Sequence, residues 1–320
     1  MSGHELGATL AIEYDGQMVV NLWGGYRDKQ RKHSWANDTI VNVFSVTKGV
    51  VAICAARLVE QGKLDLHQTV AHYWPEYDCE GKGATKVFAL LCHRAAMHGF
   101  RDSILEGHWH DWNFFTKMLA HQRPFGVPGA KQSYHALTFG WLVGELIKRV
   151  DGRSVGHYFQ DEIARPLDLD FKIGLDASDI ARCAEKVMSR TPKILPGIDF
   201  MRYCPDFILP KTLKNIKDAV CCDDFHVAFP ANLDPATTVN SQSWRLAEIP
   251  AANGHATAAS LAMLYGILSN GGNRNGFRLL APETIDIATK IQSNGPDTVL
   301  FGLPFKFGLG FMVDSPTTPI

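Results

Sequence analysis

The sequence lacks the features that mark nucleic-acid-binding, membrane and secreted proteins. Lys plus Arg total 32 and Asp plus Glu total 33 over 320 residues, a net charge of −1 that attracts neither nucleic acid nor an anionic membrane. No apolar run approaches the length of a membrane span. The first ten residues lack the basic segment and apolar core of a signal peptide. We therefore expect no nucleic-acid partner, no transmembrane segment and an intracellular, cytoplasmic location, with a mitochondrial one as the alternative if residues precede Met1.

The spacing of cysteine and histidine residues also indicates neither a disulfide framework nor a metal site. The seven cysteines are odd in number and irregular in spacing, so reduced thiols are the simpler interpretation. Cys221 and Cys222 are adjacent, too constrained to clamp a metal, and are expected to be inert. The run His108-Trp109-His110-Asp111 is one residue short of a His-x-His-x-Asp metallohydrolase motif, and no second motif accompanies it. We expect no metal and no cofactor.

Several segments have clear secondary-structure signals. Hydrophobic residues make up 46% and charged residues 20%, which is typical of a globular protein with a sizeable core. Two apolar runs around Asp15-Gly16 predict a β-hairpin, 7–14 with 17–23. Capping residues and apolar periodicity predict helices over 44–61, 138–150, 154–164 and 257–270, one opening at Pro282, and a strand over 307–313. The stretch 176–250 is rich in proline and cysteine and gives no organised pattern.

The order of these elements favours an α+β fold. Strands and a buried helix come first, a long helical middle follows, and helices with a strand come last. This order suits a sheet built from both chain ends, with a helical lobe between them. We expect one domain over 1–320, with an α/β lobe from about 1–75 and 250–320 and a helical lobe over about 76–249.

Ser45 and Lys48 begin the helix predicted over 44–61, whose interior is apolar on nearly every face. A spacing of three places both side chains on one helical face, within reach of each other. A serine hydroxyl is a poor nucleophile until a neighbouring base takes its proton. Lysine is that base only when neutral, which requires its pKa to fall by roughly three units from about 10.4. Burial can lower it, and the helix N-terminus favours an oxyanion beside Ser45.

A structural role is the alternative for this pair, because Ser-x-x-Lys is short and occurs by chance in many proteins. In that alternative Ser45 caps the helix and Lys48 reaches solvent from its first turn. Lysine is a poor choice in a first turn on dipole grounds, which favours the catalytic interpretation slightly.

Tyr134 lies in the turn-rich stretch 128–136, just before the helix predicted over 138–150. Beside a lysine, its phenol could be held as phenolate or share its proton, shuttling it between Ser45 and a leaving group. For Tyr134 taken alone, the favoured alternative is a ring packed at a domain rim with its hydroxyl hydrogen-bonded. The neighbouring His135 either lines the cleft or packs.

Together these motifs resemble the serine β-lactamase-like family, which includes class C β-lactamases, penicillin-binding DD-peptidases and carboxylesterases. The similarity is greatest to the esterase-like and LACTB-like branch. The matching segments run in family order along nearly the whole chain: WGGYRD (23–28), VFSVTKGV (43–50), LVEQGKLDL (58–66), YWPEY (73–77), LLCHRAAM (90–97), PGAKQSYHALTFGWLVGELI (128–147), RPLDLDFKIGL (165–175) and NGHATAASLAMLYGILSNGG (253–272).

The resemblance implies a mixed α/β lobe with an antiparallel sheet flanked by helices, a separate helical lobe, and an active site between the two lobes. It also implies that Ser45 is acylated, that Lys48 deprotonates it and that Tyr134 relays the proton. His93, within LLCHRAAM, falls in a segment that is structural in the family, so core hydrogen bonding is its expected role.

Two departures from the family pattern shape the expectation. Lactamases and peptidases usually have Asn two residues after the tyrosine, where its amide contacts the substrate's amide; Ala136 occupies that position and favours esters. His135 and Ala136 are the candidate substrate-binding residues. The family's late Lys-Thr-Gly or His-x-Gly triplet is also missing. We therefore expect a chain without its C-terminal strands, poorly soluble and nearly inactive, because one lost oxyanion donor lowers the rate about a hundredfold or more.

Three functions compete at this point. The leading one is a serine hydrolase that forms an acyl-enzyme on small esters or amides. The second is a catalytically silent LACTB-like scaffold that self-assembles into homo-oligomers. The third is a β-lactamase or DD-peptidase, which Ala136 argues against. Labelling of Ser45, oligomers that survive Ser45→Ala, and nitrocefin hydrolysis respectively distinguish them.

Overall fold

The structure, a computed structural model, describes residues 5–104, 108–187, 205, 223–230, 233–234 and 237–315. Its helices are α1 (Val46–Glu60), α2 (Val70–Tyr73), α3 (Val87–Leu91), α4 (Trp112–His121), α5 (Thr138–Asp151), α6 (Val155–Phe159), α7 (Ala177–Ile180), α9 (Asp223–Ala228), α10 (Gln242–Leu246), α11 (Ala258–Ser269) and α12 (Pro282–Thr289), with the short turns η1 (Pro75–Tyr77), η2 (His108–His110) and the π-helical η3 (Gln160–Ala164). Its strands are β1 (Gly7–Tyr14), β2 (Gln17–Gly25), β3 (Val41–Asn42), β4 (Phe171–Ile173), β5 (Gly254–Ala256), β6 (Asn273–Arg274), β7 (Phe277–Arg278), β8 (Ser293–Pro296), β9 (Pro304–Phe307) and β10 (Met312–Val313).

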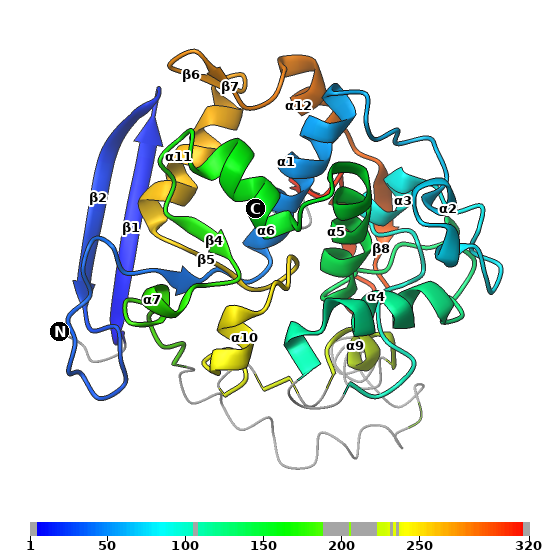
Figure 1. Cartoon of the computed structure of the whole chain (residues 1–320), viewed down its shortest axis with the longest axis horizontal. Helices are drawn as coiled ribbons and strands as arrows, with labels where there is room; N and C mark the ends of the chain where they lie inside the picture. The colour runs from blue at the N-terminus through cyan, green and yellow to red at the C-terminus, as the bar shows by residue number, and fades with distance from the viewer. Residues whose placement is uncertain are drawn as a thin grey trace.

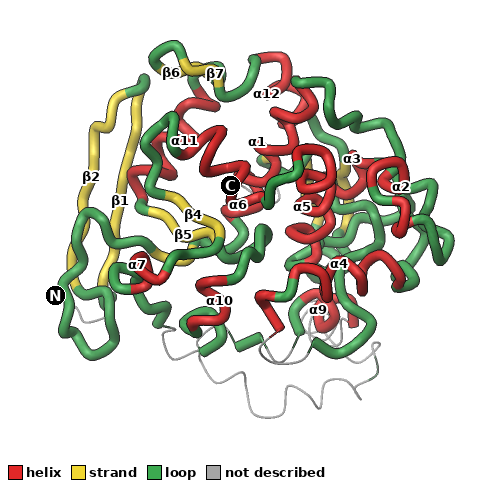
Figure 2. Tube along the Cα trace, in the orientation of Figure 1, coloured by secondary structure: helices red, strands yellow, loops and turns green. Residues whose placement is uncertain are grey.

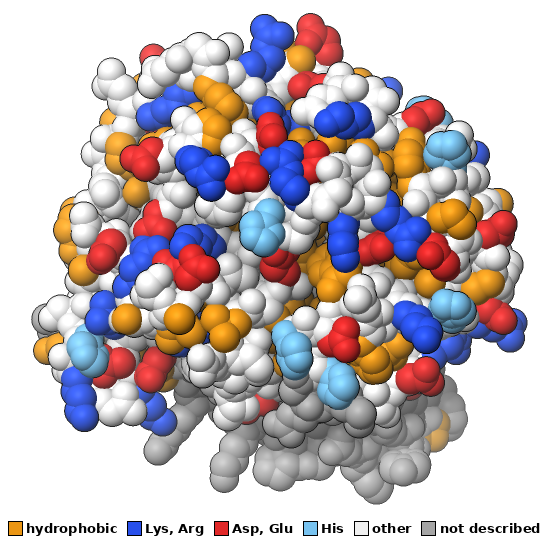
Figure 3. Space-filling model, viewed as in Figure 1, with side chains coloured by type: hydrophobic (Ala, Val, Ile, Leu, Met, Phe, Trp, Pro, Cys, Tyr) orange, Lys and Arg blue, Asp and Glu red, His pale blue; other side chains and the backbone are white. Residues whose placement is uncertain are grey.

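Helices α1, α5 and α6 gather in the middle of the molecule, and the β1–β2 hairpin stands at one side (Figure 1, Figure 2). The strands form small antiparallel sheets in the orders β1-β2, β3-β5-β4, β10-β9-β8 and β6-β7. Helices and antiparallel strands together confirm the predicted α+β class. Acidic and basic side chains are interspersed over the face that Figure 3 shows. None of the helices in the described ranges has the length and apolar composition needed to cross a membrane.

The β1–β2 hairpin confirms the turn predicted at Asp15-Gly16. Both turn residues have positive φ, 49° and 74°, the conformation that a type I′ hairpin turn requires. Helix α11 packs against one face of the hairpin. Within the described residues β1 pairs with β2 alone, and β8–β10 form a separate sheet. These strands do not join the two chain ends, but β3 pairs with β5, so residues 41–42 and 254–256 do share one small sheet, with β4 at its edge.

Helix α1 confirms the predicted buried helix, although it begins at Val46, two residues later than expected. Its Val50, Val51 and Ile53 side chains are fully buried. The helix is enclosed because α5, α6 and α12 all pack against it. Gln61 is the C-cap and Gly62 follows with φ 67°, as predicted for the helix end. Elements assigned to both predicted lobes thus contact α1, and the division at residues 75 and 250 stays a prediction.

Two predicted elements differ in the structure. The helix expected over 154–164 is capped by Ser154, as predicted, but it continues as the π-turn η3 after Phe159. The Gln160 amide in that turn donates to the Phe171 carbonyl at 2.5 Å, which ties the turn to β4.

The prediction of one strand over 307–313 was wrong. Of these residues only Phe307, the end of β9, and Met312–Val313, which form β10, are strand, and Gly308 and Gly310 lie in the turn between them. A Cβ on Gly308 would lie 2.2 Å from the Ala288 carbonyl oxygen, and Gly310 has φ 83°. The Gly308 N–H bonds the Phe311 carbonyl at 2.8 Å, which closes a tight turn between the two strands.

Gly310→Ala is expected to lower the free energy of unfolding by about 2–4 kcal/mol, because backbone strain and overpacking add. A Cβ on Gly310 would lie 2.4 Å from the Ala52 Cβ of α1, at φ 83°. Gly62→Ala is the matched control, since Gly62 also has positive φ but no atom within 4 Å of its Cβ position. Urea unfolding gives the free energy of unfolding of both variants, and the difference between their losses is the contribution of overpacking against Ala52. Equal losses would show that contact with α1 is not critical.

Candidate active site

Ser45 occupies the N-cap position of α1, with φ −68° and ψ −8°, and is solvent-exposed. Its side chain makes no capping hydrogen bond. The preceding Phe44 has φ 47°, a left-handed conformation that is strained for a residue with a bulky side chain. The Ser45 hydroxyl therefore does not serve as a helix cap, which removes half of the structural alternative.

Lys48 is buried, with 4% of its surface exposed, and does not reach solvent. Its Nζ lies 3.2 Å from Ser45 Oγ and donates to the carbonyl oxygens of Ala136 at 2.7 Å and Ala251 at 2.8 Å. Burial lowers the pKa of Lys48 to about 7. Near neutral pH the amine is thus divided between its neutral and charged forms, as a general base requires.

The turn that carries the Ala251 carbonyl also contains Asn253, which is fully buried. The Asn253 Oδ1 accepts the Ile249 N–H at 2.8 Å, and its amide donates to the carbonyls of Trp244 at 2.7 Å and Ala247 at 2.6 Å. This fixes the turn that leads into β5. The same turn packs closely on α5, since a Cβ on Gly140 would lie 2.6 Å from the Ala251 N, and the Ala251 carbonyl is therefore a rigid partner for Lys48.

Tyr134 joins the pair as the sequence predicted. Its side chain is 8% exposed, and its ring centroid lies 5.0 Å from Lys48 Nζ. Burial raises the pKa of Tyr134 to about 12, while a hydrogen bond with Ser45 acts in the opposite direction. The phenol is therefore protonated near neutral pH. Of the two states considered for Tyr134, a shared proton fits this environment and a standing phenolate does not.

His135 and Ala136 lie next to this group but are buried. His135 has no exposed surface; its Nδ1 lies 2.7 Å from the Ser133 carbonyl, and its Nε2 accepts the Met97 N–H at 3.2 Å. Burial lowers the pKa of His135 to about 3, so its imidazole is neutral. Ala136 contributes its carbonyl oxygen to Lys48. Direct contact of either residue with substrate stays a prediction.

The remaining histidine and cysteine patterns lie outside this group. His108 and His110 fall in η2, and Asp111 caps α4 through the Phe114 N–H at 3.0 Å. The described part of the chain contains no cluster of three or more potential metal-ligating side chains. Its four cysteines, Cys54, Cys79, Cys92 and Cys183, are free. Cys221 and Cys222 lie outside the described residues.

Two contributors to the site were missed in the sequence. The Ala251 carbonyl comes from a turn 203 residues after Lys48. Asp297 bonds the Tyr134 N–H from 163 residues further along the chain. A main-chain carbonyl has no sequence signal, and Asp297 lies in an ordinary Pro-Asp-Thr turn.

Comparison with known proteins agrees with this geometry. The Beta-lactamase family model matches residues 1–319. Esterase/beta-lactamase LipL of Mycobacterium tuberculosis is 32% identical over 313 residues, which span 95% of this chain and 68% of that protein. A penicillin-binding protein homologue from Caulobacter crescentus superposes with a TM-score of 0.82 at 36% identity, and a family VIII carboxylesterase with 0.84 at 32%. Each structural match covers 98% of this chain and 78% of the other. The chain belongs to the Beta-lactamase family.

Proposed function

We propose that this chain hydrolyses small esters through an acyl-enzyme on Ser45, with Lys48 as the base and Tyr134 as the proton relay. Its family and its similarity to esterases make it a serine hydrolase of the carboxylesterase-like type. One observation supports the residue roles above all others. Lys48 Nζ is buried 3.2 Å from Ser45 Oγ, in surroundings that bring its pKa to about 7.

In the first step neutral Lys48 takes the Ser45 proton while Ser45 Oγ forms a bond to the ester carbonyl carbon. Lys48 becomes an ammonium group, which the Ala136 and Ala251 carbonyl oxygens already face at 2.7 and 2.8 Å. These dipoles are in place before the charge forms, so little reorganisation is needed. The Ser45 N–H at the start of α1 is the amide that we propose to hold the oxyanion. The sequence has no Lys-Thr-Gly or His-x-Gly triplet to supply a second donor, so we expect slow turnover, and each fold-change below is relative to this unsubstituted chain.

In the second step the carbon–oxygen bond to the alcohol breaks. Tyr134 gives its phenolic proton to the departing oxygen and receives one from the Lys48 ammonium, so the charge returns to its starting state. A water molecule then attacks the acyl-enzyme by the reverse sequence of proton transfers. The buried Ala136 methyl offers no amide to a substrate's amide group, which supports esters over β-lactams and peptides.

A fluorophosphonate reagent tests the proposal without depending on turnover. We expect it to label Ser45 stoichiometrically in the folded protein, detected by peptide mass spectrometry. Ser45→Ala is the control and should take no label. A folded protein whose Ser45 stays unmodified would contradict the proposal and favour a silent scaffold.

Tyr134→Phe is expected to lower kcat by about 10²-fold for an alkyl ester while the ring packing is kept. The stacking of Tyr134 on Phe307, with centroids 6.1 Å apart, does not need the hydroxyl. A p-nitrophenyl ester of the same acid should lose less, because p-nitrophenolate leaves without a proton. Steady-state kinetics on both esters checks this. Equal losses would place the hydroxyl in serine activation alone, not in leaving-group protonation.

A further inference from the structure

The segment that contains Tyr134 is neither helix nor strand, yet its backbone is bonded at each step. The Ser133 N–H donates to the His93 carbonyl at 2.9 Å. The Tyr134 N–H donates to Asp297 Oδ1 at 3.0 Å, and the His135 N–H to His93 Nδ1 at 3.1 Å. Consecutive amides are therefore held from two sides, by His93 and by Asp297.

Asp297 follows β8 and has no exposed surface. Its Oδ1 accepts N–H groups from Tyr134, Val299 and Leu300, each at 3.0 Å. One carboxylate oxygen thus closes its own turn and holds the Tyr134 amide at the same time. These three N–H donors favour the ionised carboxyl, whereas burial, the larger effect, raises the pKa of Asp297.

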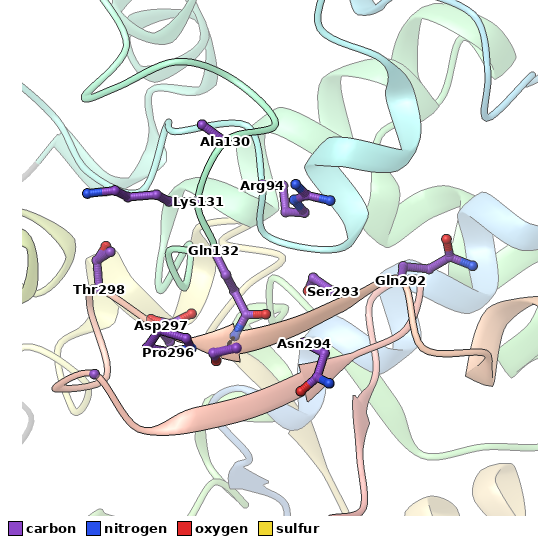
Figure 4. Close-up of a pocket in the computed structure, with 12 residues that line it drawn as sticks. Arg94, Ala130, Lys131, Gln132, Gln292, Ser293, Asn294, Pro296, Asp297 and Thr298 are labelled. Atoms are coloured by element: carbon purple, nitrogen blue, oxygen red, sulfur yellow. Dashed lines mark hydrogen bonds between the residues drawn. The ribbon is translucent and has the colours of Figure 1, made fainter.

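The turn that Asp297 closes is also joined to the residues before Tyr134. The Thr298 N–H donates to the Gln132 carbonyl at 3.1 Å, and the Thr298 hydroxyl to Ser133 Oγ at 2.8 Å. Gln132 and Asp297 lie together at the end of β8, beside a pocket of about 410 Å³ that both help to line (Figure 4). Two adjoining stretches of backbone are therefore aligned against one another.

The hydroxyl of Tyr134 depends on this alignment, because its ring is long and a small backbone shift moves the oxygen away from Ser45. A misplacement of about 1 Å in a catalytic group lowers a rate by about 10²-fold. Substituting His93 would not separate backbone positioning from ring packing. Its ring lies 4.8 Å from that of Tyr134 and also packs on Phe139 and Phe307. Asp297 reaches the backbone from outside that cluster.

We propose that Asp297 is a positioning residue for Tyr134, which fixes the Tyr134 backbone and so aims its hydroxyl at Ser45 and the leaving group. The inference rests on the proposed function. If Asp297 only stabilised its own turn, its substitution would not affect catalysis through the Tyr134 hydroxyl.

Asp297→Ser is the informative variant. A serine hydroxyl can still accept the amide protons of Val299 and Leu300 within its own turn, as in an ST-turn. Its shorter side chain does not reach the Tyr134 N–H. We expect kcat for an alkyl ester to fall by about 10²-fold with KM little changed. Asp297→Asn keeps an acceptor at Oδ1 and should restore most of the rate.

Asp28→Ala is the matched control for loss of a buried carboxylate. Asp28 is 9% exposed and accepts the Lys32 and His33 N–H groups at 2.9 and 2.7 Å, in a loop after β2. It makes no contact with Ser45, Lys48 or Tyr134 within the described residues. We expect its kcat to stay within about twofold of the unsubstituted chain.

A double-mutant cycle gives the decisive readout, with circular dichroism confirming that each variant is folded. In a Tyr134→Phe background, Asp297→Ser should lower kcat by less than about threefold, because the hydroxyl that it aims is already gone. Equal losses in both backgrounds, or an Asp297→Ser variant with unchanged kcat, would overturn the inference. Failure of fluorophosphonate to label Ser45 in the unsubstituted chain would instead defeat the proposed function.

Discussion

Ser45→Ala is expected to abolish the p-nitrophenolate burst and to lower the rate of ester cleavage by about 10⁴-fold or more, the loss typical of removing a serine nucleophile. The hydroxyl is the atom that forms the bond to the acyl carbon, and no other group in the site replaces it. The Ser45 side chain is exposed and caps nothing, so stability should change by less than about 0.5 kcal/mol. Stopped-flow absorbance measures the burst, and thermal unfolding checks the fold.

Ser269→Ala is the matched control for this result. Ser269 is an exposed serine at the end of α11, and its hydroxyl bonds only the Gly266 carbonyl, at 2.9 Å, among the described residues. This variant should keep the full burst. Activity that survives in Ser45→Ala but not in Ser269→Ala would be incompatible with the account.

Lys48→Met is expected to lower the rate of Ser45 acylation by about 10³-fold, within the range found for a general base. Methionine fills most of the same buried space but neither accepts a proton nor reaches the Ala136 and Ala251 carbonyls at 2.7 and 2.8 Å. Single-turnover release of p-nitrophenolate gives the acylation rate directly.

Lys48→Arg tests whether Lys48 acts as the base or only as a structural cation. Arginine keeps hydrogen-bond donors for both carbonyls but stays charged at every accessible pH. We expect a loss as large as that of Lys48→Met, with the folded state confirmed by circular dichroism. An active Lys48→Arg protein would mean that Lys48 only orders the site.

Local signals in the sequence predicted the parts of the molecule that local chemistry determines. The Asp15-Gly16 turn, the Ser154 cap and the Thr257 cap of α11 all follow from side chains and backbone within a few residues. The Ser45–Lys48 spacing follows from helical geometry in the same way. These features needed no knowledge of the remaining chain.

The rest of the site could not be predicted because it depends on distant contacts. Lys48 meets the Ala136 and Ala251 carbonyls across 88 and 203 residues, and Asp297 meets Tyr134 across 163. The burial that lowers the pKa of Lys48 likewise comes from packing of α5 and β5 around α1. The turn that replaces the middle of the strand predicted over 307–313 also packs against distant residues, because a Cβ on Gly308 would clash with the Ala288 carbonyl and one on Gly310 with Ala52.

The pH dependence of Ser45 phosphonylation tests most directly whether Lys48 is the base. Burial lowers the pKa of Lys48 to about 7 in the folded protein, and its neutral form, present above that pH, accepts the serine proton. The second-order rate constant should therefore rise with pH and level off, with a midpoint of about 7, and Lys48→Met should abolish this transition. A rate that is independent of pH, or a midpoint near the ordinary lysine value of about 10.4, would show that Lys48 is not the proton acceptor.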